Sequence, residues 1–253
     1  MDSRILKLAV EASEDAGRLL KKSFRRETQV KHKSERELVS DADLKSEDII
    51  LSRIRREFPE HAVYSEEAGS DGRKSRFEWV VDPLDGTHNF LYGMPLYGVA
   101  VAVLEDDEPV ASAIRLPEFN ETYTATKGGG AYVNGKPIHV SSRTIRESML
   151  LFECQLHRGT EEKLRMLGNL SSRGFSVRIL GVATVAFAWL ARGLADFYEI
   201  ADAKLCDVAA GALLVSEAGG MVTDFYGRPW NKYSKNVAAS NGVIHENVIE
   251  KLK

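Results

Sequence analysis

Apolar positions follow a helical spacing first and a strand-like spacing afterwards in residues 1–140. The first stretch predicts a helix capped by Ser3, with its apolar face formed by Ile5, Leu8, Ala9, Ala12, Ala16 and Leu19. A second helix is predicted from Asp41 to Phe58, and Ser40 to Asp43 resembles a capping box at its start. Strands are then predicted at Ala62–Ser65, Phe77–Asp82, Tyr97–Leu104, Val110–Leu116 and Glu121–Lys127.

The second part of the chain alternates between the two spacings. Strands are predicted at Met149–Glu153, Ser176–Leu180, Asp196–Ile200, Met221–Asp224 and Asn236–Ser240. Helices are predicted near residues 160–172, at Ala183–Arg192 and Asp207–Ala218, and at the C-terminus. An antiparallel-rich part followed by an alternating part predicts an α+β or α/β layered sandwich with two domains, residues 1–140 and 141–253.

The tract Gly128-Gly129-Gly130 lies between strand-like runs and could be a phosphate cradle. No Lys-Ser/Thr pair follows it, so a turn or bulge is the favoured interpretation.

Composition narrows the class of protein. The 253 residues are 43% hydrophobic and 28% charged, which is typical of a globular protein and excludes a disordered or fibrous one. The formal net charge of −3 means that an anionic ligand needs a local site or a recruited cation. The absence of a signal peptide and of a long apolar run predicts a cytoplasmic protein without a membrane partner. The basic pairs Lys21-Lys22 and Arg25-Arg26 have no interleaved aromatic residues, so no nucleic-acid partner is expected. Cys154 and Cys206 are interpreted as buried reduced thiols, with a redox pair as the alternative.

Carboxylates gather where predicted strands end. The strand Trp79–Asp82 ends on an acid, and Asp85 follows three residues later in a turn that contains Pro83 and Gly86, so the strand is expected to stop there. Two aspartates that face one point repel each other unless a cation lies between them.

Two further acidic positions resemble the first. Glu66-Glu67 also ends a strand, and Asp207 begins an apolar helix, where helix capping is the alternative interpretation. Oxygen ligands without a His or Cys partner favour Mg²⁺ or Mn²⁺ over Zn²⁺.

These residues carry a family resemblance. Ser65-Glu66-Glu67, the run from Trp79 to Phe90 (WVVDPLDGTHNF) and Asp207-Val208-Ala209-Ala210-Gly211 are similar to the three signatures of the inositol monophosphatase family, which are lithium-sensitive, magnesium-dependent phosphomonoesterases. Gly219–Asp224 follows the last motif as in that family, and the likeness covers roughly residues 5 to 250. The resemblance implies a layered αβαβα sandwich of the inositol monophosphatase/fructose-1,6-bisphosphatase type and a homodimer.

The resemblance also implies a metal centre. One Mg²⁺ is expected on Glu66, Asp82 and the Leu84 carbonyl, and a second on Asp82, Asp85 and Asp207. A third, weaker ion shares the glutamate in the family, and Mn²⁺ is expected to substitute. The expected catalytic residues are Glu66, Asp43 and Thr87. Asp43 and Thr87 resemble the pair that orients the attacking water in the family.

The substrate side is expected around the same turn and in the second half of the chain. Backbone N–H groups of Gly86 and Thr87 are predicted to bind the phosphate. The full set of predicted substrate-binding residues is Asp85, Gly86, Thr87, Gly181, Ala183, Arg178, Arg192, Glu199 and Asp207. A second phosphate is expected to meet Arg192 or Arg178, with Arg158, Lys163 and Arg165 as further candidates.

The family glutamate that reads the cyclitol would fall at Ile200, so Glu199 or Asp202 is expected to replace it.

The predicted function is a Mg²⁺-dependent phosphomonoesterase that hydrolyses inositol 1-phosphate and fructose 1,6-bisphosphate, small phosphorylated cyclitol and sugar substrates. One alternative is a phosphatase for another small ester, such as 3′-phosphoadenosine 5′-phosphate or histidinol phosphate. The other is a regulatory binding protein that retains the metal site.

Overall fold

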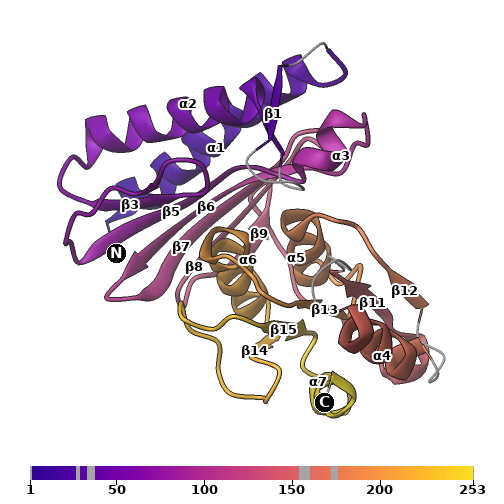
Figure 1. The fold of residues 1–253 in the computed structure, drawn as a ribbon. Helices are drawn as coiled ribbons and strands as arrows, with labels where there is room; N and C mark the ends of the chain where they lie inside the picture. Colours follow the sequence, from indigo (N-terminus) through magenta and orange to yellow (C-terminus); the bar gives the residue numbers. More distant parts are fainter. Residues whose placement is uncertain (1, 27–28, 33–37, 154–159, 172–175, 253) are drawn as a thin grey trace.

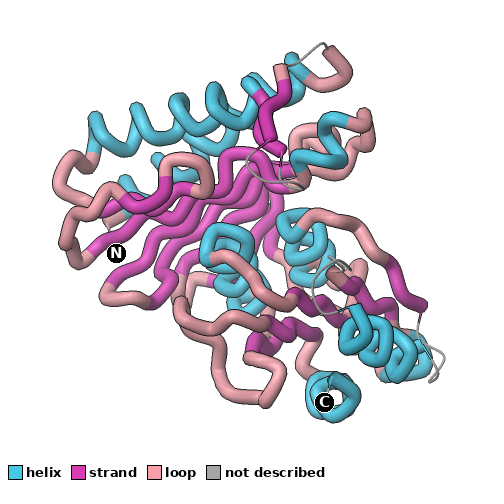
Figure 2. The backbone as a smooth tube through the Cα atoms, viewed as in Figure 1, coloured by secondary structure: helices cyan, strands magenta, loops and turns pink. Residues whose placement is uncertain are grey.

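Two β-sheets and three layers of helices alternate in the computed structural model (Figure 1). The structure describes residues 2–26, 29–32, 38–153, 160–171 and 176–252. In order, the layers are α1 and α2, the first sheet, α5 and α6, the second sheet, and α4 and α7, with the helices and strands distinguished in Figure 2. The predicted αβαβα sandwich is therefore confirmed.

The first sheet has eight strands in the order β10-β9-β8-β7-β6-β5-β3-β4 among the residues described. Only the β3–β5 pair is parallel; the other neighbours are antiparallel. The strands are β3 (Ala62–Ser65), β4 (Gly69–Ser70), β5 (Phe77–Asp85), β6 (Gly98–Glu105), β7 (Glu108–Leu116), β8 (Glu121–Thr126), β9 (Gly130–Val133) and β10 (Lys136–Pro137).

Both faces of this sheet are buried, and β6 shows how its sequence allows this. Val99, Val101 and Val103 point to the helices α1 (Ser3–Ser23) and α2 (Asp41–Glu57). The intervening residues Ala100 and Ala102 point to the core shared with α5 (Ala183–Ala191) and α6 (Leu205–Glu217). Because side chains alternate across a strand, an apolar residue is needed at every position of a strand that is covered on both sides.

The second sheet has the order β12-β11-β13-β15-β14. Its strands are β11 (Met149–Phe152), β12 (Ser176–Arg178), β13 (Phe197–Ile200), β14 (Met221–Thr223) and β15 (Val237–Ser240). The outer face is covered by α4 (Thr160–Ser171) and α7 (His245–Leu252), which share a separate apolar core with it. Helices α5 and α6 pack between the two sheets and share one apolar core with both (Figure 1). The predicted division into two domains near residue 140 stays a prediction.

Smaller elements complete the chain. A two-stranded ribbon pairs β1 (Val30–His32) with β2 (Leu38–Ser40), α3 spans Thr87–Leu91, and a 3₁₀ helix spans Ile145–Glu147. None of the described helices has the length and apolar character that a membrane span requires.

Several predicted helix and strand ends differ from the observed ones by one or two residues; β7, for example, begins at Glu108 rather than Val110. The side chain of Asp2, not Ser3, caps α1 by accepting a hydrogen bond from the Arg4 amide at 2.9 Å. Helix α6 begins two residues before Asp207, and β12 ends at Arg178 rather than Leu180. Each error lies within two residues of a helix or strand end, where alternative caps compete.

A larger difference concerns β5, which continues through Pro83 to Asp85 instead of stopping at Asp82. Its register with β6 shifts there, because Asp82 pairs with Ala100 whereas Asp85 pairs with Gly98. Three steps on β5 thus match two on β6, which is the signature of a β-bulge. A bulge accommodates Pro83, which has no N–H to donate to the neighbouring strand.

The Gly128–Gly130 tract forms the turn between β8 and β9, as predicted. Its amides bind a carboxylate of the same chain. The amides of Gly128 and Gly130 donate to the two carboxylate oxygens of Glu217 at 2.7 and 2.8 Å. The end of α6 is thereby tied to the edge of the first sheet.

Candidate functional site

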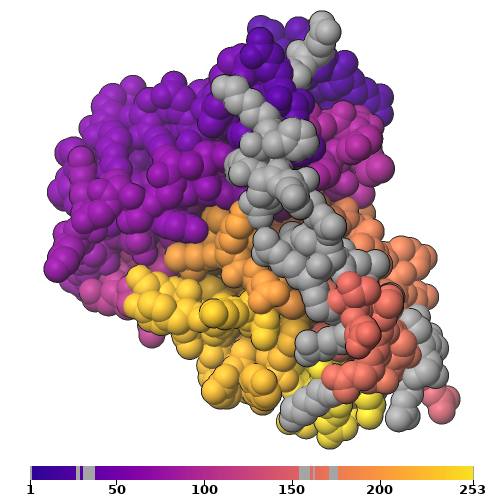
Figure 3. Space-filling view, viewed as in Figure 1, coloured from indigo at the N-terminus to yellow at the C-terminus, as the bar shows by residue number. Residues whose placement is uncertain are grey.

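The acids predicted as ligands come together where β3 and β5 end and α6 begins. Since β3 and β5 are parallel, Glu66 after β3 and Asp82 and Asp85 at the end of β5 lie at the same edge of the sheet. Asp207, in the first turn of α6, approaches from the second half of the chain. The ammonium of Lys204 spans the two halves by pairing with Glu66 Oε1 at 3.1 Å, in line with the contact of orange and purple residues in Figure 3.

Asp82 is the most enclosed of these acids, with 2% of its surface exposed. One carboxylate oxygen of Asp82, one carboxylate oxygen of Asp207 and the sulfur of Cys206 all lie within 4.8 Å of one another. Burial raises the pKa of Asp82 well above its usual range, and the negative charges of Glu66 and Asp85 raise it further. A buried carboxyl group in such a position must take up either a proton or a cation.

Asp85 and Asp207 are each held by a backbone amide. Asp85 accepts a hydrogen bond from the Thr184 amide, at the start of α5. Asp207 accepts one from the Lys204 amide at 3.0 Å, so it caps α6 and also faces the acid cluster. Burial raises the pKa of Asp85 to about 7 and that of Asp207 to about 6 in spite of these hydrogen bonds.

This donor set fits a hard divalent cation. Carboxylate oxygens dominate it, and the Leu84 carbonyl lies in the bulge between Asp82 and Asp85. Burial raises the pKa of the Cys206 thiol well above its usual range, and its sulfur lies 3.6 Å from Asp207 Oδ1 as a thiol donor. A protonated thiol is a poor metal ligand, so the oxygen donors decide the chemistry. Cys154, the other half of the redox alternative, lies outside the described residues.

The predicted Asp43–Thr87 pair is formed. Thr87 Oγ1 donates to Asp43 Oδ1 at 3.0 Å, although residue 43 lies on α2 and residue 87 on α3. Asp43 is fully buried, and its Oδ2 accepts from the Ser40 amide at 2.8 Å and the Ser40 hydroxyl at 2.6 Å. Burial raises the pKa of Asp43, while these hydrogen bonds oppose the rise. Asp43 therefore closes the predicted capping box and binds Thr87 with its other oxygen.

The phosphate-side turn has the expected backbone. Gly86 precedes α3 with φ of +85°, a left-handed conformation that glycine adopts without strain. A β-carbon there would lie 3.0 Å from the Leu96 carbonyl oxygen and 3.1 Å from Val182 Cγ2. The first N–H groups of α3 have no partner within the helix, which suits an anion at this point.

The turn is tied to the predicted organic-binding segment by Asn89. Its side-chain amide donates to the carbonyl oxygens of Leu96 and Leu180, both at 2.9 Å. Gly181 and Ala183 follow directly, and the next residue, Thr184, contacts Asp85. The structure thus brings Gly181 and Ala183 to the acid cluster.

The two arginines proposed for a second phosphate are placed differently. Arg192 caps the far end of α5, roughly 13 Å along the helix axis from Ala183, and forms an ion pair with Glu121. Arg178 is exposed at the end of edge strand β12, where it donates to the Val177 carbonyl at 2.8 Å. Of the further candidates, Lys163 is buried on α4 and Arg165 exposed, whereas Arg158 lies outside the described residues.

Glu199 and Ile200 occupy opposite faces of β13. Ile200 belongs to the apolar core beneath α5 and α6, whereas Glu199 is 1% exposed and accepts a hydrogen bond from the Glu153 amide at 3.1 Å. Burial raises the pKa of Glu199 to about 8 and that of Glu153 to about 7. Asp202, the other suggested replacement, is exposed.

Several residues at the site were not predicted. Ser46 and Glu47 lie three and four positions after Asp43, a spacing that already places them on its face of α2. Glu153 follows a strand, the same signal that pointed to Glu66. No local pattern marks Lys204, because its contact with Glu66 spans 138 residues.

The raised pKa values predict how stability depends on pH. Without a divalent cation, the melting temperature should decrease as the pH rises from 6.5 to 8.5. The folded protein still holds protons on Asp85, Glu153 and Glu199 at pH 6.5, whereas the unfolded chain has already released them. Folding therefore takes up protons, and stability decreases as pH rises through the folded pKa values of about 7 to 8.

Thermal denaturation in EDTA at three pH values in this window measures the effect. His245, whose pKa burial lowers from 6.5 to about 4, acts in the opposite direction at the lower end of this window, because the unfolded imidazole still binds protons near pH 6.5. The decrease should therefore be clearest at the upper end of the window, where the imidazole is neutral in both states. A saturating divalent cation should reduce the decrease. A melting temperature in EDTA that stays constant or increases with pH would contradict the raised pKa values of these three carboxyl groups.

The chain is similar to known proteins along most or all of its length. A model of the inositol monophosphatase family matches residues 1–253. The fructose-1,6-bisphosphatase/inositol-1-monophosphatase of Thermotoga maritima is 36% identical over 217 residues, 85% of this chain and 82% of that protein. The Nus factor SuhB of Xylella fastidiosa is 37% identical over 232 residues, 90% and 84% of the two chains. The structure of the extragenic suppressor protein suhB from Bartonella henselae superimposes with a TM-score of 0.96 at 32% identity, covering 99% of each chain.

Proposed function

Because the chain belongs to the inositol monophosphatase family and is a phosphoric monoester hydrolase, we propose that it hydrolyses small phosphorylated cyclitols and sugars with the help of Mg²⁺. The observation that carries the proposal is the buried acid cluster around Asp82, with the hydrogen-bonded pair Asp43–Thr87 beside it. The cluster needs positive charge, and a phosphate ester needs the same charge to be bound and cleaved.

Glu66, Asp82 and the Leu84 carbonyl would hold one Mg²⁺, while Asp82, Asp85 and Asp207 would hold a second. A third, weaker ion would share Glu66. When bound, Mg²⁺ or its substitute Mn²⁺ supplies Lewis acidity to the phosphoryl group and acidifies water. The raised pKa values of Asp82, Asp85 and Asp207 support this assignment, since these groups gain most from a nearby cation.

Thr87 and Asp43 would orient the attacking water. The Thr87 hydroxyl has a single proton, and the Asp43 carboxylate accepts it at 3.0 Å. The lone pairs of Thr87 Oγ1 are then directed away from Asp43 and can accept a hydrogen bond from water. Gly86 and Thr87 would bind phosphate oxygens through their amides, as the start of α3 favours.

The proposed substrates are inositol 1-phosphate and fructose 1,6-bisphosphate. The Thermotoga maritima relative is named for both activities, which supports this pair. Gly181, Ala183 and Glu199 would contact the hydroxyl groups of the leaving alcohol. Arg178 would meet a second phosphate, whereas the ion pair of Arg192 with Glu121 holds that guanidinium at the distant end of α5. The proposal also includes a homodimer, as the family resemblance implies, and a cytoplasmic location, as the sequence predicts.

A regulatory binding role is the second candidate. It is favoured by the similarity to a relative named Nus factor SuhB. The intact acid cluster and the intact Asp43–Thr87 pair support catalysis in addition to, or in place of, such a role.

Phosphate release from a panel of esters tests the proposal. Inositol 1-phosphate and fructose 1,6-bisphosphate should both be hydrolysed with Mg²⁺ and not in EDTA, because the cation contacts the phosphate rather than the alcohol. 3′-Phosphoadenosine 5′-phosphate and histidinol phosphate should be poorer substrates; a clear preference for either would replace the proposed substrates. Release from no ester would favour the regulatory role.

The same panel of esters tests whether Arg178 binds the second phosphate of the bisphosphate. Arg178→Ala should raise the KM for the bisphosphate and leave inositol 1-phosphate hardly affected, since a charge-assisted hydrogen bond contributes about 1.5–3 kcal/mol. Arg146→Ala is the matched control, because Arg146 is also an exposed arginine of the second half but lies in the 3₁₀ helix and is not a candidate for the second phosphate. Equal losses on both substrates would remove Arg178 from the second-phosphate site.

A further inference from the structure

Helix α2 carries a buried polar stripe on the face that packs toward the site. Asp43, Ser46 and Glu47 are spaced as i, i+3 and i+4, so they lie side by side on one face. Their exposed fractions are 0%, 0% and 7%. The next buried positions on the helix, Ile50 and Ile54, are apolar. Burying three polar side chains in succession costs stability unless each finds a partner.

Each of the three side chains contacts a different segment of the acid cluster. Asp43 accepts from Thr87, as described above. The Ser46 hydroxyl donates to the Pro83 carbonyl oxygen at 2.6 Å, in the bulge between Asp82 and Asp85. Glu47 reaches the loop after β3.

Glu47 contacts the residues that flank Glu66 in the sequence. Its Oε1 accepts from the Ser65 hydroxyl, from the Glu67 amide at 3.2 Å and from the Ala68 amide at 3.0 Å. Glu66 lies between these residues, and its own amide donates to the Val81 carbonyl at 3.1 Å. The main chain on both sides of Glu66 is thereby fixed relative to α2 and β5.

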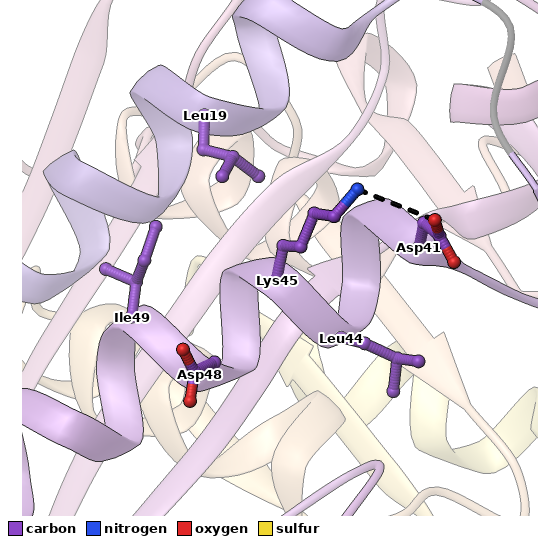
Figure 4. A pocket seen from close by; sticks show the side chains of 6 residues that line it. All are labelled: Leu19, Asp41, Leu44, Lys45, Asp48 and Ile49. Atoms are coloured by element: carbon purple, nitrogen blue, oxygen red, sulfur yellow. Dashed lines mark hydrogen bonds and ion pairs between the residues drawn. The ribbon is translucent and has the colours of Figure 1, made fainter.

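The outward face of α2 is separate from this stripe. Asp41, Leu44, Lys45, Asp48 and Ile49 line an open surface pocket of about 420 Å³ together with Leu19 of α1, and Lys45 pairs with Asp41 at 3.5 Å (Figure 4). The polar residues of the inward face are therefore directed to the site and not to this pocket.

We propose that Ser46 and Glu47 are positioning residues that set the separation of Glu66 from the Asp82–Asp85 bulge before a cation binds. The inference rests on the proposed function in so far as Glu66 and Asp82 are ligands. One helix, α2, then holds three parts of the site in register: the water-orienting Thr87, the bulge of β5, and the loop that carries Glu66. Such preorganisation removes a reorganisation cost from cation binding.

Binding of Mn²⁺ to the metal-free protein, measured by isothermal titration calorimetry, tests this without substrate. Glu47→Ala removes the acceptor for three donors and should raise the Mn²⁺ dissociation constant at least about tenfold. Glu47→Gln keeps an oxygen that can accept these hydrogen bonds and should raise it less than about threefold. Ser46→Ala should give an intermediate increase.

Asp224→Ala is the matched control. Asp224 is also a buried acid that holds a turn, since its Oδ1 accepts from the Tyr226 and Arg228 amides at 2.9 and 3.0 Å, but it follows β14 at the edge of the second sheet. This variant should lower the melting temperature as Glu47→Ala does and leave the Mn²⁺ affinity unchanged. If Glu47→Ala does not fold, Glu47→Asp, which withdraws the carboxylate by one methylene, should show the same weakening.

The outcomes separate the two proposals. Wild-type Mn²⁺ affinity in folded Glu47→Ala or Glu47→Asp, or an equal weakening in Asp224→Ala, overturns the positioning role and leaves the proposed function intact. A wild-type protein that binds no Mn²⁺ overturns both. Weakening by Glu47→Ala with restoration by Glu47→Gln supports the positioning role.

Discussion

Asp82→Asn should abolish phosphate release while the protein remains folded. The carboxylate of Asp82 is proposed to serve both cation sites, so replacing one oxygen by an amide removes a charge that both sites use. We expect a decrease of more than about a thousandfold, which corresponds to roughly 4 kcal/mol of transition-state stabilisation. Initial rates at saturating Mg²⁺ and circular dichroism of the same preparation measure the two halves of the prediction.

The same substitution should raise the melting temperature of the metal-free protein. Burial and the negative charges of Glu66, Asp85 and Asp207 make an ionised residue 82 costly, and a neutral amide avoids this cost. For a chain of this size each kcal/mol gained shifts the melting temperature by about 2–4 °C.

Asp196→Asn provides the control for this effect. Asp196 is also fully buried, but it pairs with Arg143 at 3.0 Å and accepts from the Met149 amide at 2.8 Å. Neutralising a carboxylate that has its partners should destabilise the protein. Substantial Mg²⁺-dependent turnover in folded Asp82→Asn would falsify the two-metal assignment, and a lowered melting temperature in EDTA would contradict the electrostatic argument.

Thr87→Ala and Asp43→Asn should each reduce kcat by about a hundredfold or more, while the Mg²⁺ concentration for half-maximal rate changes less than about threefold. Neither residue is proposed as a ligand, so the loss should appear in the chemical step. In Asp43→Asn, an amide N–H facing Thr87 would donate to Oγ1 instead of accepting from it. The Thr87 proton would then turn to the Leu84 carbonyl oxygen, which lies 3.1 Å away.

The double variant separates a pair from two independent residues. If Asp43 acts through Thr87, Asp43→Asn/Thr87→Ala should be little slower than the slower single variant. Losses that multiply fully would mean that the two residues act independently. Asp2→Ala, which removes the cap of α1, controls for helix destabilisation and should lower the melting temperature without a change in kcat.

Much of the site could be predicted because it is encoded locally. The capping box at Ser40 and Asp43 is read from four consecutive residues, and the structure contains it with both hydrogen bonds. The acids at the ends of β3 and β5 follow from strand patterns and from the short motif around Asp82. Periods of 3.6 and 2 residues determine which side chains share a face, so helices, strands and their buried faces are properties of short segments.

An error appeared where a local signal was weighed without its neighbours. Pro83 predicted the end of a strand, yet β5 continues through it because β6 accepts a bulge. Arg192 as a phosphate ligand stays a prediction, and the fold adds that Arg192 caps the C-terminal end of α5 in an ion pair with Glu121. The apolar residue at position 200 was recognised from its spacing to Asp207, and the alternation of β13 adds that Ile200 lies in the apolar core whereas Glu199 accepts a hydrogen bond from the Glu153 amide.

The sequence by itself determined most of the helices, the longer strands and the acidic motifs of the candidate centre, because these are encoded in residues close together in the chain. The resemblance of those motifs to a known family then indicated the layered fold. Only the tertiary structure decided which residues support those acids. Lys204 reaches Glu66 across 138 residues, Thr184 reaches Asp85 across 99, and Glu47 encloses the Glu66 loop from another element. Such contacts depend on how the sheets and helices pack, and no local periodicity records that packing.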